Sequence, residues 1–387
     1  MKTLIFPSEF IDNRGGVPQS TISIVKGLSH FSEFKIIVVC PNGSEMSTTD
    51  FPLNVIVKTT KKSVWTMSKN KVCETLYTIL DLYRTIRPFL DRDTWVITNQ
   101  PVTSALLSLI PSKHINEIYI NRGGNFQDKG IASKIIIQKL KHHCIDFAVG
   151  ISKKQTDLLI QCGMPENRVT LIHNGLPMPA FDYPHKDLSK DYLRISTMGF
   201  ISDLKNQIEG IRLIKLLRDH GINAILNLYG DPDGDNEYQT KIAHEIKILG
   251  IKPYINFCGF VSGENLFAET DILISFSRTE GFGRSLVEGM LRRKPIIAWR
   301  GAGGPIDITD NGKYGHLVES NNADAYFKVV CSLLDNPSFN KNNVEAAYNF
   351  AYTHFTTECM VKNYAKLIKS ACNICCLLYT SPSPRDI

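Results

Sequence analysis

The sequence predicts an α/β protein made of two doubly wound domains of similar size. Short runs of β-branched residues alternate with segments of helical period along most of the chain, and a stretch rich in Pro and polar residues interrupts the alternation near its middle. Such alternation is typical of parallel sheets with crossover helices. A chain of 387 residues, 43% of them hydrophobic, is long enough to bury two cores.

The first half of the chain contains the first set of alternating elements. Apolar residues recur at helical spacing over residues 19–31 and 72–86. The expected strands are residues 2–6, 34–40, 53–58, 94–98, 117–121, 147–152 and 169–174. We therefore expect an N-terminal domain over residues 1–180.

The alternation begins again after the Pro-rich stretch at residues 174–191, so we expect a domain boundary near residues 178–192. The new strands are expected at residues 193–200, 223–230, 254–260, 272–277, 295–300 and 315–319. They define a C-terminal domain over residues 190–357. Ligands of doubly wound sheets bind outside the carboxyl ends of the strands, so we expect the ligand in a cleft between the two domains.

Charge and hydropathy narrow the function classes. The net charge is +6, and much of the excess lies in residues 58–71 and 133–143. Such segments suit an anionic lipid surface or a nucleic acid, but the sequence shows no helix-turn-helix, zinc-finger or RNA-recognition signature. The sequence has no run of 18 apolar residues and no apolar run of signal-peptide length at its start. We expect a cytoplasmic protein, with peripheral association at the inner face of the membrane, and no nucleic-acid partner.

Two glycine-rich turns are candidate ligand contacts. Gly15 and Gly16 follow the first strand and precede a helix, where the backbone can approach a ligand closely, although a tight turn without a ligand has the same sequence. The turn at residues 301–305 lacks the third glycine of a dinucleotide fingerprint, because Ile306 occupies that position. We therefore expect no nicotinamide cofactor.

The stretch "RTEGFGRSLVEGM", residues 278–290, places two carboxylates around a Gly-Phe-Gly turn. Glu280 is expected in the loop and Glu288 in the helix that follows, which is too far apart for an acid/base pair. A helix start between two carboxylates suits a ligand with hydroxyl groups at both ends and negative charge in the middle, such as a nucleotide-sugar. The alternative is that Glu280 only interacts with the helix dipole and Glu288 is solvated.

These residues resemble the Glu-x7-Glu motif of the retaining glycosyltransferases of family four, which have the GT-B fold and include many enzymes of lipopolysaccharide, O-antigen and capsule assembly. The similarity extends to "NRGG" at 121–124, "LIHNG" at 171–175, "MGFISDLKNQ" at 198–207 and "GAGGPIDITDNGKYGHLVE" at 301–319. It implies two Rossmann-like domains facing a central cleft, and a last helix at residues 358–375 that crosses back to the N-terminal domain.

The resemblance also implies a donor site. Glu288 would hold the ribose hydroxyls, Glu280 would contact the transferred sugar, and Lys205 would neutralise the diphosphate. Backbone donors for the sugar and diphosphate would be Gly16, Phe282, Gly283, Arg284 and Ser285. Main-chain atoms of Gly259, Phe260 and Val261 would pair with the base.

Asn121 and Arg122 resemble residues on the acceptor side of the cleft. One residue departs from the family pattern: Phe200 follows Gly199 where relatives usually have an arginine. Either Arg278 or Arg284 would then replace the missing cation, or activity would be reduced.

The implied reaction transfers a hexose or N-acetylhexosamine from a nucleoside-diphosphate-sugar to a lipid-linked or cell-surface saccharide, with retention, and with no cofactor or metal. The Asp-x-Asp patterns at residues 231–235 are interpreted as a turn instead of a metal site. Two alternatives remain: a weakened relative that binds nucleotide-sugar without transferring it, and a nucleic-acid-binding protein.

The end of the sequence has a different origin in our interpretation. Residues 376–386, "CLLYTSPSPRD", match the peptide that one reading frame of a common sequencing-library adapter encodes. We therefore expect residues 376–387 to be an adapter-derived artefact.

Overall fold

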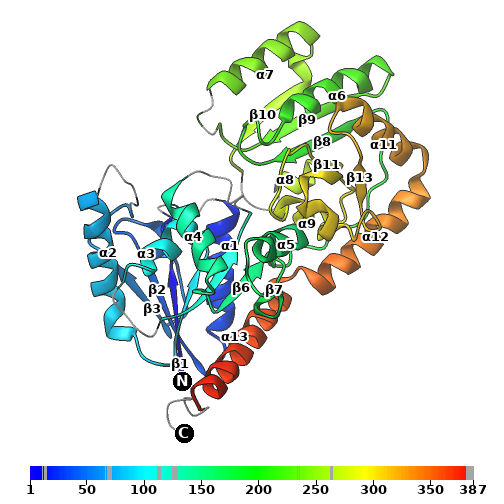
Figure 1. Cartoon of the computed structure of the whole chain (residues 1–387). Coiled ribbons are helices and arrows are strands. Elements are labelled where there is room, and N and C mark those ends of the chain that lie inside the picture. Colours follow the sequence, from blue (N-terminus) through cyan, green and yellow to red (C-terminus); the bar gives the residue numbers. More distant parts are fainter. Residues whose placement is uncertain are drawn as a thin grey trace. The chain divides into compact units, whose positions relative to one another are not determined.

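The computed structural model describes the chain from Met1 to Thr380, apart from residues 11, 13–14, 66, 68–71, 111–114, 124–129, 233, 235 and 262–264, and only the backbone of residues 236 and 372–380. The chain forms two compact units. The first comprises Met1–Gly175 and the helix that begins at Thr357, and the second comprises Leu176–Thr356. Both units contain a parallel sheet with helices packed on it (Figure 1).

The first unit is built on a seven-stranded parallel sheet with the order β3-β2-β1-β4-β5-β6-β7. Its strands are β1 (Lys2–Pro7), β2 (Phe34–Cys40), β3 (Val55–Thr59), β4 (Thr94–Thr98), β5 (Asn116–Asn121), β6 (Phe147–Gly150) and β7 (Val169–Leu171). All seven strands expected from the sequence are present. Almost every residue of the central strands is buried, as in sheets that are covered on both faces.

The helices of the first unit are α1 (Gly16–Leu28), α2 (Val72–Ile86), α3 (Pro101–Leu107), α4 (Ile131–Lys141), α5 (Lys153–Gln161) and α13 (Thr357–Thr380). Short 3₁₀ turns lie at Glu45–Thr48, Arg87–Phe89 and Glu166–Arg168. None of the described helices is both long enough and apolar enough to span a membrane.

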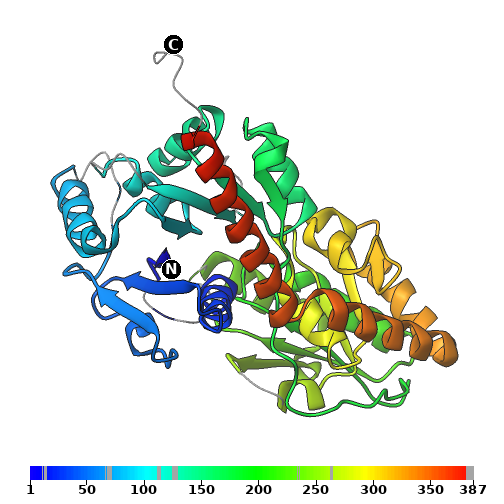
Figure 2. The same cartoon turned by 90° about the horizontal axis from the view of Figure 1, so that it is seen from below.

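The last helix packs against the first one, although some 330 residues separate them in sequence. Gly27 permits the close approach, because a Cβ atom there would lie 2.2 Å from Cγ2 of Val361. Lys369 Nζ lies 2.6 Å from Glu33 Oε1 and adds an ion pair at the same contact. Figure 2 shows α13, in red, passing beside α1, in dark blue. The helix continues to Thr380, and the proposed adapter origin of residues 376–387 stays a prediction.

The second unit has a six-stranded parallel sheet with the order β10-β9-β8-β11-β12-β13. The strands are β8 (Leu193–Met198), β9 (Ala224–Tyr229), β10 (Ile255–Gly259), β11 (Ile272–Ser275), β12 (Ile296–Trp299) and β13 (His316–Val318). The helices are α6 (Gln207–Asp219), α7 (Asn236–Leu249), α8 (Asn265–Ala268), α9 (Arg284–Met290), α10 (Gly304–Ile308), α11 (Ala323–Asp335) and α12 (Pro337–His354), with 3₁₀ turns at Lys252–Tyr254 and Arg300–Ala302.

The strand order of the second sheet reverses between β8 and β11, which are neighbours in space but not in sequence. At such a switch point the connections leave the sheet in opposite directions, so that a crevice forms outside the carboxyl ends of the two strands. The segments that follow β8 and β11 are therefore the first place to look for a ligand site.

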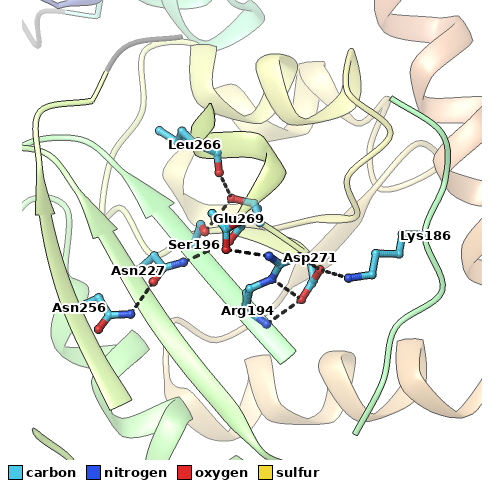
Figure 3. Close-up of polar contacts among 9 residues, drawn as sticks. Lys186, Arg194, Ser196, Asn227, Asn256, Leu266, Glu269 and Asp271 are labelled. Carbon is cyan, nitrogen blue, oxygen red and sulfur yellow. Dashed lines mark hydrogen bonds and ion pairs between the residues drawn. The ribbon is translucent and has the colours of Figure 1, made fainter. Parts of the chain in front are cut away.

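A polar network joins the same two strands at their other end (Figure 3). The Arg194 guanidinium, near the start of β8, donates to both carboxylate oxygens of Asp271 at 3.1 and 2.8 Å, and the Arg194 backbone N–H donates to the same carboxylate at 2.9 Å. Glu269 accepts a further bond from Arg194 at 2.8 Å. Arg194 and Asp271 are buried, so this pair fixes the entry of β11 beside β8.

We predict that this network makes stability fall at acid pH. Burial alone would raise the pKa of Asp271, but the hydrogen bonds from Arg194 outweigh it and hold that pKa below its ordinary value. Because the folded-state pKa of Asp271 is depressed, the contribution of its carboxylate to the free energy of unfolding is complete above the unfolded-state pKa of about 3.9. That contribution is lost as the pH falls through the folded-state pKa.

Asp271→Asn should therefore lower the free energy of unfolding by roughly 3 kcal/mol at neutral pH, and by much less near pH 2, as measured by urea denaturation. Asp335→Asn is the matched control, because Asp335 pairs with Lys190 at the exposed surface. It should change stability little at any pH. An Asp271→Asn effect of equal size at both pH values would contradict this assignment.

Candidate functional site

Two predicted site residues meet at the switch point of the second sheet. Lys205 lies in the segment after β8, and Glu280 lies in the segment after β11. Lys205 Nζ is 2.5 Å from Glu280 Oε1, and Ser277 donates its hydroxyl to the same oxygen at 2.7 Å. The Lys205 and Glu280 side chains are 29% and 14% exposed, so the pair is reachable from solvent although the protein shields much of it.

The backbone fixes Glu280 in place. Its N–H donates to the carbonyl of Ala302 at 2.9 Å, and its carbonyl accepts from the N–H of Gly304 at 3.1 Å. Gly304 has no room for a side chain, because a Cβ atom there would lie 2.2 Å from the carbonyl oxygen of Phe282. The glycine-rich turn at residues 301–305 therefore positions the carboxylate, which sequence reasoning did not recognise.

Three glycines keep the carboxyl ends of β8, β9 and β10 close together. Gly199 has φ +133°, and a Cβ atom there would lie 3.0 Å from Cε of Lys205, so its small size leaves space for the lysine stem. A Cβ atom on Gly230 would lie 2.1 Å from the carbonyl oxygen of Gly199. The Gly230 N–H donates to the carbonyl of Gly259 at 2.8 Å.

Exposed apolar side chains follow these glycines. Phe200, Phe260 and Val261 are 51%, 53% and 38% exposed. The Phe260 N–H donates to Asp231 Oδ1 at 3.1 Å, so this aspartate has a structural contact at the end of β10. Asp233 and Asp235, the other members of the Asp-x-Asp patterns, lie outside the described residues.

The helix after Glu280 begins as the sequence predicts. Gly283 has φ +104° and caps α9, and Phe282 is buried with its ring centroid 5.6 Å from that of Phe355. Arg284 and Ser285 occupy the first turn, and Glu288 follows in the second. Burial lowers the pKa of Arg284, and the negative charge of Glu288 opposes that shift, so these two side chains influence one another.

Arg278, one of the two residues that could replace the missing cation, contacts the segment that contains Lys205. Its Nε donates to the carbonyl of Asp203 at 3.1 Å and its Nη2 donates to Asn206 Oδ1 at 3.0 Å. Its backbone N–H donates to the carbonyl of Leu204 at 2.8 Å. Arg278 therefore holds the 203–206 segment, which contains Lys205. The positioning contacts of Ser277 and Arg278 were not predicted, although both residues lie within three positions of Glu280.

The remaining predicted residues lie in the first unit. Gly16 is the first residue of α1. Asn121 ends β5, and its Nδ2 donates to Gln155 Oε1 at 2.8 Å. Arg122 Nη1 donates to Asn174 Oδ1 at 2.7 Å. These contacts gather amide and guanidinium groups at the carboxyl ends of β5 and β7, whereas Gly124 of the "NRGG" motif lies outside the described residues.

The chain is similar to known glycosyltransferases in sequence. Residues 183–350 match the family model described as glycosyl transferases group 1. An uncharacterized glycosyltransferase of Methanocaldococcus jannaschii is 23% identical over 410 residues, which cover 96% of this chain and 99% of that protein. The poly(ribitol-phosphate) alpha-N-acetylglucosaminyltransferase of Staphylococcus aureus is 23% identical over 263 residues, 65% of this chain and 50% of that protein.

Solved structures share the whole fold. The Anabaena protein HepE, crystallised in complex with UDP, aligns with a TM-score of 0.76 at 16% identity, covering 96% of this chain and 100% of that one. Sucrose-phosphate synthase from Thermosynechococcus elongatus aligns with a TM-score of 0.78 at 14% identity, covering 96% and 99%. The architecture is thus the GT-B fold of glycosyltransferases, with two Rossmann-like parallel-sheet domains, as the resemblance predicted. The residues that match the glycosyl transferases group 1 model, 183–350, all lie in the second unit.

We predict that Phe200→Arg leaves the fold intact. The ring is half exposed, so the introduced charge stays solvated and the free energy of unfolding should change by less than about 0.5 kcal/mol. Phe276→Arg is the matched comparison, because Phe276 is fully buried against Tyr326 and the same substitution there should cost several kcal/mol. Urea denaturation of both variants measures the difference; equal losses would show that Phe200 is a core residue.

Proposed function

We propose that this protein is a retaining glycosyltransferase that transfers a hexose or N-acetylhexosamine from a nucleoside-diphosphate-sugar to a lipid-linked or cell-surface saccharide. The observation that carries the proposal is the Lys205–Glu280 pair at the switch point of a glycosyltransferase group 1 domain. UDP in the HepE complex supports a nucleotide donor. The name of the S. aureus relative supports an N-acetylhexosamine and a polymeric acceptor.

The two charges of the pair suit the two parts of a nucleoside-diphosphate-sugar, its diphosphate and its sugar. Lys205 offers an ammonium to the diphosphate, and Glu280 offers a carboxylate to the hydroxyl groups of the sugar. Lys205 and Glu280 form an ion pair with each other at 2.5 Å. A bound donor would replace this pair with two contacts, one between its diphosphate and Lys205 and one between its sugar and Glu280. Each charge would keep a partner, so the electrostatic cost is small. Ser277 keeps Glu280 oriented during the exchange, since its hydroxyl bonds to the same carboxylate oxygen.

In the proposed reaction, the bond between the anomeric carbon and the diphosphate oxygen breaks, and a bond from that carbon to the acceptor hydroxyl oxygen forms on the same face. The acceptor proton passes to the departing diphosphate oxygen. The step needs no protein nucleophile, cofactor or metal, and Lys205 stabilises the charge that develops on the leaving group.

The other predicted residues complete the proposed site. Glu288 holds the ribose, the backbone around Phe282–Ser285 binds the sugar and diphosphate, and the main chain of Gly259–Val261 pairs with the base. In the first unit, Gly16 remains the predicted backbone donor, and Asn121 and Arg122 remain the predicted acceptor-side residues. We also propose peripheral association with the inner face of the membrane, because a lipid-linked acceptor is anchored there.

A second candidate function is nucleotide-sugar binding without transfer. Phe200 favours it, because the residue stands where the family usually has an arginine, and Arg278 is engaged by the 203–206 segment. Binding with no turnover of any donor, over a mixed pool of saccharide acceptors, would select this candidate over the transferase.

We predict that a uridine or guanosine diphosphate compound raises the melting temperature and that NAD does not. A ligand at 100 times its dissociation constant stabilises the folded state by about 2.7 kcal/mol, which a thermal-shift assay detects. Glu288→Ala should abolish most of the shift, because the ribose is bound equally in the ground and transition states. No shift with any nucleotide or nucleotide-sugar would count against the donor site.

We predict that Lys205→Ala lowers turnover by roughly two to three orders of magnitude, because one preorganised donor to a developing anion contributes about 3 to 4 kcal/mol. The matched control is Lys215→Ala, which removes a lysine paired with Asp219 on the exposed side of α6. It should keep wild-type turnover.

The double variant Lys205→Ala/Phe200→Arg tests whether a cation at residue 200 can replace the ammonium of Lys205. An arginine at residue 200 should restore part of the lost turnover, since it returns a cation to the carboxyl end of β8. Wild-type turnover in Lys205→Ala alone would remove Lys205 from the site.

A further inference from the structure

The helix α2 exposes apolar residues on the face that points away from its sheet. Val72, Leu76, Tyr77 and Leu80 are between 45% and 57% exposed. Leu76 and Leu80 are four residues apart and therefore lie one above the other on the same side of the helix. A solvent-facing helical stripe is ordinarily polar, so this one indicates a contact with something other than water.

The helix itself is firmly held, so its exposed stripe is not the result of loose packing. Its opposite side places Ile79, Leu82 and Ile86 in a buried cluster with Ile37 and Val96 of the sheet. Figure 1 shows α2 at the edge of the first unit, beside β3 and β2. The helix thus has two apolar sides: the sheet covers one of them, and the other is exposed.

The loop before α2 brings positive charge to the stripe. The Lys62 backbone N–H donates to Asp81 Oδ2 at 2.9 Å, which anchors the loop on the helix. Lys62 Nζ then lies 5.7 Å from the ring centroid of Tyr77 and donates to the carbonyl of Glu74 at 3.3 Å. The ammonium is therefore held beside the apolar side chains and next to the first turns of the helix.

More cations lie around the same face. Lys61 is exposed in the loop, and Arg84 and Arg87 are exposed at the far end of α2. Among the described residues between 58 and 93, the exposed carboxylates are those of Glu74, Asp91 and Asp93, because Asp81 is buried. The exposed cations of the same range are Lys58, Lys61, Arg84, Arg87 and Arg92, so positive charge exceeds negative charge around the stripe.

We propose that this α2 face, made of Leu76, Tyr77, Leu80 and Arg84 together with Arg87 of the 3₁₀ turn that follows the helix, docks on an anionic lipid surface. A half-exposed apolar stripe can enter the boundary between headgroups and acyl chains, while arginines and lysines next to it pair with anionic headgroups. The charge favours lipid over a second copy of this chain, because two such faces would repel one another. The inference deepens the proposed function, which supplies the reason for a membrane contact.

The test is sedimentation with vesicles of phosphatidylethanolamine and phosphatidylglycerol, compared with vesicles of phosphatidylcholine alone. The full chain should bind the anionic vesicles, and binding should weaken as salt is raised. Leu76→Ser/Leu80→Ser should reduce the partition coefficient by about tenfold or more. Arg84→Gln/Arg87→Gln should reduce it by roughly 30-fold, from about 1 kcal/mol for each cation.

The matched control is Ile248→Ser/Phe339→Ser, which removes two equally exposed apolar side chains from α7 and α12 of the second unit. It should bind the anionic vesicles like wild type. Thermal denaturation followed by circular dichroism verifies that each variant is folded, which is expected because all the substituted side chains are at the surface.

Three results would overturn the proposal: no binding of the full chain to anionic vesicles, equal binding by both α2 variants and wild type, or a concentration-dependent dimer that the Leu76→Ser/Leu80→Ser variant abolishes. Because vesicle binding is measured without donor or acceptor, and turnover is measured with a soluble acceptor without vesicles, failure of the docking surface is distinguished from failure of the proposed transferase activity.

Discussion

The ion pair between Lys205 and Glu280 is the interaction on which the candidate site depends, and much of the second unit serves to bring its two members together. They come from segments that are 75 residues apart and meet because β8 and β11 are adjacent. Gly199 leaves space for the lysine stem, and the turn after β12 holds the backbone of Glu280. A free lysine and a free glutamate at these positions would sample many rotamers, whereas the ion pair holds both side chains in one arrangement.

The two strands that carry the pair are fixed at both ends. Arg194 and Asp271 join β8 to β11 at the amino ends, and the Lys205–Glu280 contact lies at the carboxyl ends. The Arg194–Asp271 pair is buried, whereas the Lys205–Glu280 pair is partly exposed to solvent. This difference in burial agrees with a structural role for the first pair and with the ligand contact that we propose for the second, although both consist of the same kinds of charge.

Periodicity was sufficient to predict the sheets but not the site. Buried parallel strands read as short β-branched runs, so every strand from β1 to β13 could be located, with errors of a few residues at loops such as that before β3. Lys205, by contrast, has no pattern of its own and was singled out only by resemblance. Arg278 was named, with Arg284, as a possible replacement for the missing arginine, yet its partners in the 203–206 segment depend on a loop conformation that local sequence does not determine. The same limit applies to α2, whose helical period is clear although the exposure of Leu76 and Leu80 follows from tertiary packing.

The membership of α13 in the first unit has a consequence for how the protein is made. The second unit is a continuous insertion between two parts of the first, and the two points where the chain passes between them are neighbours, since the Leu176 N–H donates to the carbonyl of Phe355 at 2.8 Å. During translation the whole second unit is synthesised before the helix that covers Gly27. The first unit emerges from the exit tunnel first, but its helix α1 stays uncovered until α13 emerges. This reverses the usual order, in which the N-terminal domain reaches its native state first.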